Sequence, residues 1–256
     1  MKRFLIAAAA VLAGTAPVLA ADLYVDPAPA PVPVFGGWYL RGELGMSNQR
    51  LGGLQQELFD DVELHPFLDD GGFNSAPIGG LGVGYQFNQW LRADAIVQYR
   101  GKADFSALDR YGHIDGSGTT VWDGTNDYDG AKSEWLLMAN AYVDLGTWYG
   151  ITPYVGAGVG TSRNTISGFR DINVPTQGVA YADSDSTWNF AWALHAGLGY
   201  QVTDRLTVDF GYTYLDLGDA KTGRIHSYDN TVDTGPMHFN NITSHDFKLA
   251  LRYSLQ

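Results

Sequence analysis

The sequence predicts an all-β protein, an eight-stranded antiparallel up-and-down transmembrane β-barrel. Three observations support this prediction. Eight segments alternate between apolar and small or polar side chains, the connections between them alternate between short and long, and the polar faces carry balanced charge. A repeat of two residues is typical of a β-strand, in which successive side chains point to opposite faces.

The eight segments follow one another along the chain with the same design. The sixth places Phe190, Leu194 and Leu198 on one face and Asn189 and His195 on the other. Residues 84–99 and 199–214 even repeat a common hairpin sequence, GYQFNQWLRADAIVQY and GYQVTDRLTVDFGYTY. We therefore predict strands over 38–46, 81–87, 91–99, 135–145, 151–159, 188–200, 206–214 and 247–255.

The connections between these segments fall into two kinds. Three are tight turns, at 88–90, 146–149 and 202–204. Four are long and rich in acidic residues, and we expect them to be loops: 48–75, 101–132, 161–186 and 215–243. Short turns at one end and long loops at the other are typical of membrane barrels, and eight strands place both termini at the turn end.

The beginning of the chain predicts export. Residues 1–20 have the form of a signal peptide, with Lys2 and Arg3 before an apolar stretch and a small-residue cleavage site after Ala20. Residues 21–35 are rich in Pro and Ala and predict an extended periplasmic linker before a barrel over 36–256. The chain has no cysteine, which excludes disulfides and thiolate chemistry.

The composition of the polar faces indicates whether they point into the barrel or outward to solvent. They carry six basic and six acidic residues together with many glycines. In a water-soluble barrel the polar face would be outside and would need no balance of charge. The interior of an eight-stranded barrel is filled by side chains, and charges buried there need partners. We therefore predict an interior network of Arg41, Glu43, Arg92, Asp94, Arg100, Glu134, Asp144, His195, Arg205, Asp209, Asp246, Lys248 and Arg252.

Aromatic residues on the apolar faces cluster near the two ends of the predicted strands. Aromatic residues favour strands in general, but two rings around an aliphatic band are typical of a barrel in a bilayer. The turn-end ring would comprise Trp38, Tyr85, Phe87, Tyr200 and Tyr253. The loop-end ring would comprise Tyr99, Trp135, Trp188, Tyr212, Tyr214 and Phe247.

Histidine and serine residues near the loop end are the candidates for chemistry. Ser244 and His245 are adjacent and should face opposite sides of a strand, and no Gly-x-Ser-x-Gly motif is present. His226 and His238 lie in the predicted loops. His195 lies on the polar face, either as a proton or metal site or, as we favour, hydrogen-bonded within the network near Asp209 or Glu43.

Acidic runs in the predicted loops resemble calcium loops only loosely. They occur at 60–61, 68–72 and 123–130, the last with Asp123, Asn126, Asp127 and Asp129. The spacing does not match an EF-hand, which also needs a glutamate at its last position. We expect solvated loops with at most weak divalent-cation binding near lipopolysaccharide phosphates, and no resident metal or cofactor.

Several stretches resemble the small eight-stranded outer-membrane barrels of the OmpA/OmpX and opacity-protein type. They are the exported start AADLYVDPAPAPVPVFGGWYLRGELG, the Gly-x-Gly-Tyr hairpins and the last strand HDFKLALRYSL. These stretches are similar to the surface barrels of alphaproteobacteria in particular. The resemblance implies an outer-membrane surface antigen or envelope-stabilising protein, sometimes called a porin.

These observations lead to a function hypothesis. We expect an outer-membrane protein, not an enzyme, with a structural or surface-interaction role in envelope integrity, adhesion or antigenicity. Its loops would face the cell surface, its termini the periplasm, and its partners would be outer-membrane lipid and lipopolysaccharide. The net charge of −12 argues against nucleic acid as a partner. The alternatives are a low-conductance porin-like channel or, with less support, a lipid-modifying enzyme.

Overall fold

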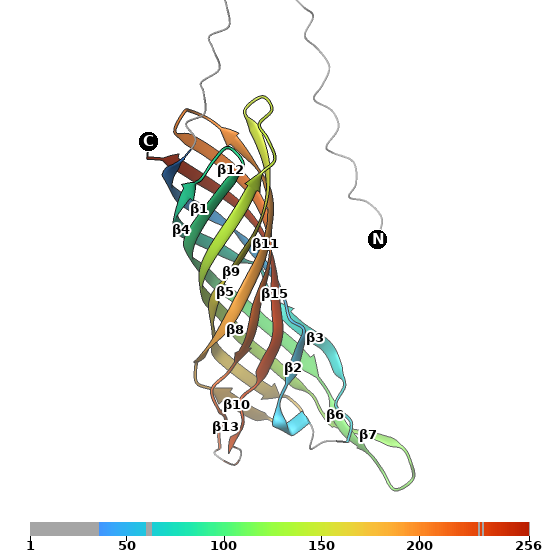
Figure 1. The fold of residues 1–256 in the computed structure, drawn as a ribbon. Coiled ribbons are helices and arrows are strands. Elements are labelled where there is room, and N and C mark those ends of the chain that lie inside the picture. The colour runs from blue at the N-terminus through green and yellow to red at the C-terminus, as the bar shows by residue number, and fades with distance from the viewer. Residues whose placement is uncertain (1–35, 60–62, 230, 232, 256) are drawn as a thin grey trace, which may run out of the picture. The chain divides into compact units, whose positions relative to one another are not determined.

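The computed structural model describes residues 36–59, 63–229, 231 and 233–255 (Figure 1). The predicted signal peptide and linker, residues 1–20 and 21–35, lie outside the described residues. Among the residues that are described, no helix is long and apolar enough to cross a membrane.

Eight long strands form a closed antiparallel ring. Each of these long strands pairs with the next long strand along the chain, and the last pairs with the first. In that closing pair, Tyr39 is opposite Ser254 and Arg50 is opposite Thr243. This closure confirms the predicted eight-stranded barrel. The ring strands are β1 (Gly37–Arg50), β4 (Ala76–Gln86), β5 (Leu91–Asp109), β8 (Asn126–Asp144), β9 (Ile151–Asn173), β11 (Asp185–Gln201), β12 (Leu206–Lys221) and β15 (His238–Ser254).

The two ends of the barrel differ in length and shape. At the turn end, β4 and β5, β8 and β9, and β11 and β12 are joined by short connections, and the C-terminus lies there too (Figure 1). The other end, which we call the extended end, carries additional short elements (Figure 1). They are β2 (Gly53–Gln55), the 3₁₀ turn η1 (Glu57–Phe59), β3 (Phe67–Phe73), β6 (Tyr111–Ile114), β7 (Thr120–Gly124), β10 (Gly178–Ala182), β13 (Ile225–Ser227) and β14 (Asp233–Thr234).

The prediction of four long loops over 48–75, 101–132, 161–186 and 215–243 is wrong in detail. Ring strands continue far into these segments, and the short strands fill much of the remainder. For example, β5 continues to Asp109 and β9 to Asn173. In these continuations the side chains still alternate between buried and exposed, as in the rest of each strand. The difference is that the apolar side chains now point inward.

β-Bulges mark the level at which this change occurs. Between Arg100 and Ala103 the pairing of β5 with β8 shifts, and the buried positions change from even to odd residue numbers. Similar shifts lie near Gly168 of β9 and Gly218 of β12, whose φ angles of 64° and 71° suit glycine. An extra residue in one strand re-aims the side chains that follow it.

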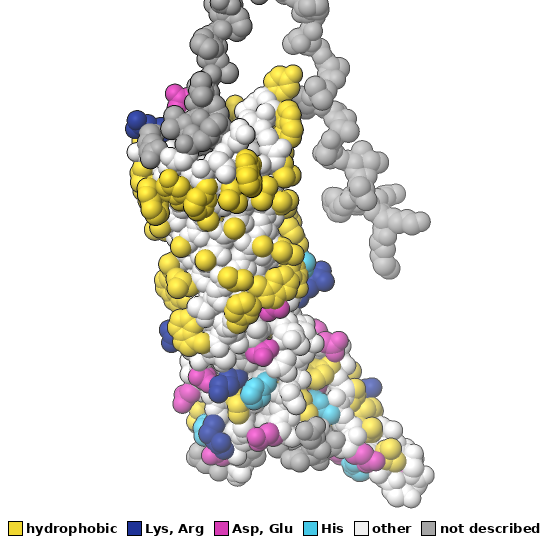
Figure 2. Space-filling view, viewed as in Figure 1, with side chains coloured by type: hydrophobic (Ala, Val, Ile, Leu, Met, Phe, Trp, Pro, Cys, Tyr) yellow, Lys and Arg dark blue, Asp and Glu magenta, His cyan; other side chains and the backbone are white. Residues whose placement is uncertain are grey.

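The bulges divide the barrel into two parts with opposite patterns. On the turn side of the bulges, in the membrane part, large apolar side chains such as Leu44 and Leu81 are exposed on the outer wall, at 71% and 74%. Figure 2 shows hydrophobic side chains over the wall of the turn-end half, in the upper part of the view, and charged side chains gathered toward the extended end. On the other side of the bulges, in the extended part, Phe73, Phe105, Phe169, Phe239 and Ile242 are buried inside.

Candidate functional site in the barrel interior

The turn-end level of the interior holds two separate ion pairs. Arg92 of β5 lies 3.1 Å from Asp144 of β8, and Arg252 of β15 lies 2.6 Å from Asp209 of β12. Arg92 is fully buried and its guanidinium also lies over the ring of Tyr142, 4.1 Å from the ring centroid. Each cation therefore has a carboxylate on a different strand of the ring, which ties the two strands together.

The middle level is a connected network centred on β1. The Arg41 guanidinium lies 3.0 Å from Asp94 and 2.9 Å from Glu43, and Lys248 lies 3.4 Å from Glu43. The Tyr142 hydroxyl accepts a further hydrogen bond from Arg41 at 3.0 Å. All of these side chains are buried, so the positive and negative groups compensate each other away from water.

The level nearest the bulges contains a cation that the sequence analysis missed. Arg100 pairs with Asp246, at 3.1 Å from one guanidinium nitrogen, and lies 3.3 Å from Glu134. Lys132 also pairs with Glu134 and donates to Gln49 at 2.9 Å. Lys132 is fully buried, although it lies in a segment expected to be a loop. Its even residue number, in phase with Glu134, was the signal that could have identified it.

One predicted member of the network lies elsewhere. Arg205 was expected in the interior, but it is exposed in the short turn before β12, which begins at Leu206. Arg205 has an odd residue number, as the inward-facing Asp209 does, which is why it was predicted inside. It is not inside because β12 begins only at the following residue. With Lys132 in place of Arg205, the interior set still has six basic and six acidic side chains.

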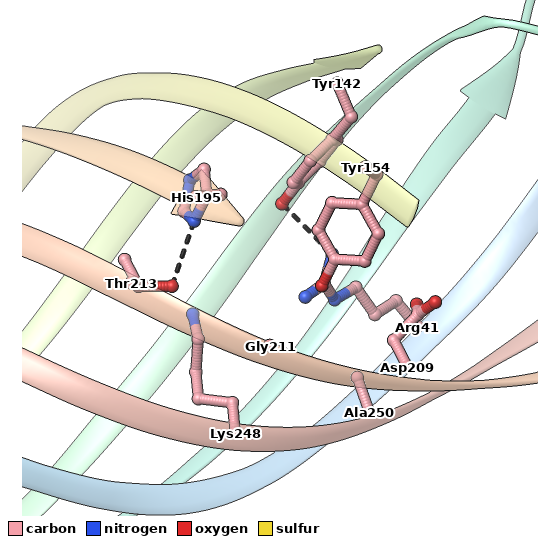
Figure 3. Close-up of a pocket in the computed structure, with 9 residues that line it drawn as sticks. All are labelled: Arg41, Tyr142, Tyr154, His195, Asp209, Gly211, Thr213, Lys248 and Ala250. Atoms are coloured by element: carbon pink, nitrogen blue, oxygen red, sulfur yellow. Dashed lines mark hydrogen bonds between the residues drawn. The ribbon is translucent and has the colours of Figure 1, made fainter. Parts of the chain in front are cut away.

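His195 lies at the middle of the interior, within a cavity shown in Figure 3. Its Nδ1 lies 3.0 Å from the Thr213 hydroxyl and its Nε2 lies 3.1 Å from Asn140 Oδ1. His195 is thus hydrogen-bonded within the interior, and its partners are Thr213 and Asn140, while Asp209, near which it was predicted, lines the same cavity. The cavity is lined by His195 together with Arg41, Tyr142, Tyr154, Asp209, Gly211, Thr213, Lys248 and Ala250.

Two cavities in the middle of the described barrel interior leave little room for water. The cavity in Figure 3 leaves no room for a water molecule, and its neighbour, lined partly by Gln98 and Arg100, offers about 10 Å³. A single buried water needs about 10–15 Å³. Around His195, Thr213 and Lys248, which line both cavities, side chains therefore fill the barrel interior.

Glycines on the inner face make room for the large interior side chains. A Cβ atom at Gly211 would lie 2.7 Å from the Tyr154 hydroxyl oxygen, and one at Gly197 would lie 2.5 Å from it. Real Cβ atoms do not approach other atoms so closely. A buried tyrosine beside paired arginines therefore needs glycine on the facing strands.

The residues considered for catalysis are held apart. Ser244 is buried and its hydroxyl lies 2.8 Å from that of Ser47, whereas His245 is on the outer face and its Nδ1 lies 2.7 Å from the Tyr212 hydroxyl. His226 lies in β13 and His238 begins β15, on separate elements.

The acidic runs do not converge on a common point. Asp123 pairs with His113 at 2.8 Å, while Asn126 bonds the Asn173 amide at 3.0 Å. Asp127 and Asp129 are exposed. Within the described ranges, no group of three or more histidine, aspartate or glutamate side chains could hold a metal ion.

The extended part contains a buried polar cluster that the sequence analysis did not identify. The Asp109 carboxylate accepts from the Tyr128 hydroxyl at 2.6 Å and lies 2.6 Å from His65 Nε2. Asp171 lies nearby, and one of its carboxylate oxygens has no hydrogen-bond partner among the described residues. Burial, followed by the charge of Asp109, raises the pKa of Asp171 to about 7.

The predicted aromatic rings lie on the outer wall of the ring strands. At the turn end, Trp38 contacts Tyr85, with ring centroids 5.2 Å apart. Toward the extended end, Tyr99 contacts Trp135 at 4.9 Å and Tyr212 contacts Phe247 at 5.5 Å. The remaining members, all at least partly exposed, are Phe87, Trp188, Tyr200, Tyr214 and Tyr253.

Comparison with known proteins gives a family and several relatives. The profile of the outer membrane protein beta-barrel domain matches residues 6–254. An uncharacterized protein of Brucella abortus is 33% identical over 229 residues, which cover 82% of this chain and 78% of that protein. Outer membrane protein PagN of Salmonella typhimurium is 28% identical, covering 85% of this chain and 90% of PagN.

Two further similarities concern an adhesin candidate and a solved structure. A candidate adhesin of Rickettsia prowazekii is 27% identical, with 85% of this chain and 87% of that protein covered. The crystal structure of Neisserial surface protein A matches with a TM-score of 0.46 and 17% identity, over 86% of this chain and 97% of that chain.

Proposed function

Because the chain belongs to the outer membrane protein beta-barrel family, we propose that it is a surface-interaction protein of the outer membrane, with its extended end outside the cell. The observation that carries this proposal is the contrast between a barrel interior with little free space and an extended end with several additional strands. The interior has little room for water, while the strands continue beyond the bulges and support several hairpins. Such an architecture suits display better than transport.

The extended end exposes several apolar side chains, although the Arg110 guanidinium lies over one face of Trp122. Two of them, Ile114 and Trp122, lie on the β6–β7 hairpin and are 46% and 43% exposed. Exposed apolar side chains rimmed by polar ones are typical of interaction surfaces. The same end also exposes Leu68, Val174, Val179, Tyr181 and Tyr228.

The relatives support an adhesive role for this surface. One relative carries the description of an adhesin candidate, and another is an outer membrane protein. We propose that the hairpins contact host or neighbouring cells. The paired charges of the interior would hold the barrel rigid beneath them. Outer-membrane lipid and lipopolysaccharide would surround the wall, and weak divalent binding at exposed carboxylates remains a prediction.

Surface display in a non-adherent Gram-negative host tests the proposal. Cells displaying the full chain should bind epithelial monolayers several-fold more than cells without it. Replacing residues 111–124 by a short Gly-Ser linker should remove most of that gain, because it removes the β6–β7 hairpin. A matched replacement of the turn 146–149 at the other end should leave it unchanged. Equal binding with and without the protein would contradict the adhesive role.

The channel alternative has its own test. Purified protein in a planar bilayer should give no large steady conductance, because side chains occupy the interior and an eight-stranded barrel is narrow. A stable, large conductance from heat-modifiable, folded protein would favour a pore and contradict a filled barrel.

A further inference from the structure

The outer wall of β9 carries a cation without a protein partner at the border of the membrane band. Arg163 is exposed and outward-facing, since its neighbours Ser162 and Asn164 are fully buried inside. Among the described residues, it has neither an ion-pair nor a hydrogen-bond partner. Some other basic side chains of this end are paired, as Lys221 is with Asp185 and Arg224 with Asp233.

Two tryptophans flank this cation directly. In the strand register, Arg163 is opposite Trp135 of β8 on one side and Trp188 of β11 on the other. Both tryptophans belong to the aromatic ring toward the extended end and are 50% and 64% exposed. Indole rings prefer the boundary between acyl chains and headgroups, so Arg163 lies at headgroup depth.

The wall around Arg163 changes in chemistry along the barrel axis. On the membrane side, Leu137 and Phe190 lie opposite Thr161 on the two neighbouring strands. On the extended side, Ser133 and Ser186 lie opposite Thr165. The order is therefore apolar side chains, tryptophans with the arginine, and then hydroxyl groups.

This order matches the outer-leaflet lipid of a Gram-negative cell, in which acyl chains, phosphates and sugar hydroxyls follow one another. With the extended end outside the cell, as proposed above, we propose that Arg163 binds a phosphate of the lipid A headgroup, with acyl chains against Leu137 and Phe190. The serine and threonine hydroxyls would contact the sugar. A guanidinium can donate two parallel hydrogen bonds to a phosphate, which an ammonium cannot.

Other unpaired cations border the same band. Lys102 lies three residues beyond Tyr99 on β5, and Arg50 lies four residues beyond Met46 on β1, and both are exposed. Neither has an ion-pair partner within the described ranges. Figure 2 shows basic side chains beside the edge of the hydrophobic band. Only Arg163, however, has a tryptophan opposite it on both sides.

Native mass spectrometry of the full chain in detergent tests this site. The probe is bisphosphorylated lipid A, compared with the same lipid A lacking both phosphates. We expect the wild type to prefer the phosphorylated lipid, and Arg163→Ala to weaken its binding about tenfold through loss of charge-assisted hydrogen bonds. The affinity of Arg163→Lys for the phosphorylated lipid should lie between those of the wild type and Arg163→Ala. Heat-modifiable gel migration confirms that each variant is folded.

Arg170 provides the matched control, since it is exposed on the same strand but seven residues farther from the membrane. Arg170→Ala should bind lipid A as the wild type does. An equal loss in both variants, unchanged binding by Arg163→Ala, or no preference for phosphates would overturn the site. Full displacement of the lipid by millimolar inorganic phosphate would show a free-anion site instead and would also overturn it.

Discussion

The membrane part and the extended part of this barrel share the long strands β5, β8, β9, β12 and β15, which run through both, yet the two parts have opposite chemistry. On the turn side of the bulges, the interior holds the paired charges together with some apolar side chains such as Ile96 and Leu215, and leucines face outward. On the extended side, phenylalanines and other apolar side chains predominate inside, and polar side chains face outward. The inversion follows the solvent, which is lipid around one part and water around the other.

Strand β5 shows how the inversion is achieved. Up to Arg100 the even-numbered residues point inward, and beyond the bulge Ala103, Phe105 and Ala107 do so. Apart from Ile96 and Leu108, the apolar residues of β5 keep odd numbers on both sides of the bulge, so the backbone shift turns this series from lipid toward the core. A bulge therefore allows one alternating sequence to expose apolar side chains to lipid on one side of it and to bury them on the other side, where the wall faces water.

The largest expected effect comes from the interior of the membrane part. Arg100→Leu leaves the buried carboxylates of Glu134 and Asp246 without their common partner. Removing one member of a buried ion pair costs about 3–5 kcal/mol, and we expect that loss in the free energy of unfolding by urea in vesicles. Arg205→Leu, in the exposed turn, should change it by at most about 0.5 kcal/mol. Similar costs for both variants would show that the interior charges are not coupled.

A somewhat smaller effect should distinguish the two outer walls. Leu194→Arg places a charge in the lipid-facing wall and should reduce the free energy of unfolding by about 2–4 kcal/mol. Val179→Arg makes the same change on exposed β10 of the extended part, where water solvates the charge, and should cost little. The comparison fails if Val179→Arg is as costly as Leu194→Arg.

The bulge itself can be tested at Gly218. Its φ angle is 71°, and an added Cβ would lie 2.6 Å from the Cβ of Asn189. Gly218→Ala should therefore cost about 1–3 kcal/mol through backbone strain. Gly53→Ala is the control, because nothing lies within 4 Å of its Cβ position. Equal stability of the two variants would mean that the bulge tolerates side chains.

The smallest effect concerns pH and only the extended part. Because the pKa of Asp171 is raised to about 7, its folded form retains a proton that the unfolded chain has lost. This group's stabilising contribution is complete below the ordinary pKa of 3.8 and is lost as the pH rises from there through about 7. Hydrogen exchange of the extended part should slow from pH 7.5 to 5.5 after correction for intrinsic rates. Asp171→Asn should remove that dependence, and an unchanged profile would contradict it.

The sequence allowed the ring to be predicted because the membrane imposes a strict pattern on the wall. Apolar alternation identified every ring strand, and the balance of charge identified the inner face. It did not reveal that Phe105 lies inside, because Phe105 has the same parity as the outward-facing Tyr99. The bulge between them leaves little trace in the residues, apart from a glycine at 101.

The errors within the interior network have the same origin. Lys132 was assigned to a loop because the segment around it lacks outward apolar residues, and Arg205 was assigned to a strand because its parity agreed with that of Asp209. The partners of His195 depend on which residues of other strands lie at the same height along the barrel axis. The tilt of the strands determines that alignment. Alternation within one strand carries no information about that alignment.

The bulge of β5 between Arg100 and Ala103 should coincide with the membrane surface. Since the chain has no cysteine, single cysteines at positions 95, 97, 104 and 106 can each carry an environment-sensitive fluorophore in lipid vesicles. Labels at 95 and 97 should be quenched by brominated acyl chains, and labels at 104 and 106 by aqueous iodide. Lipid quenching at 104 and 106, or aqueous quenching at 95 and 97, would contradict the inversion of the two parts.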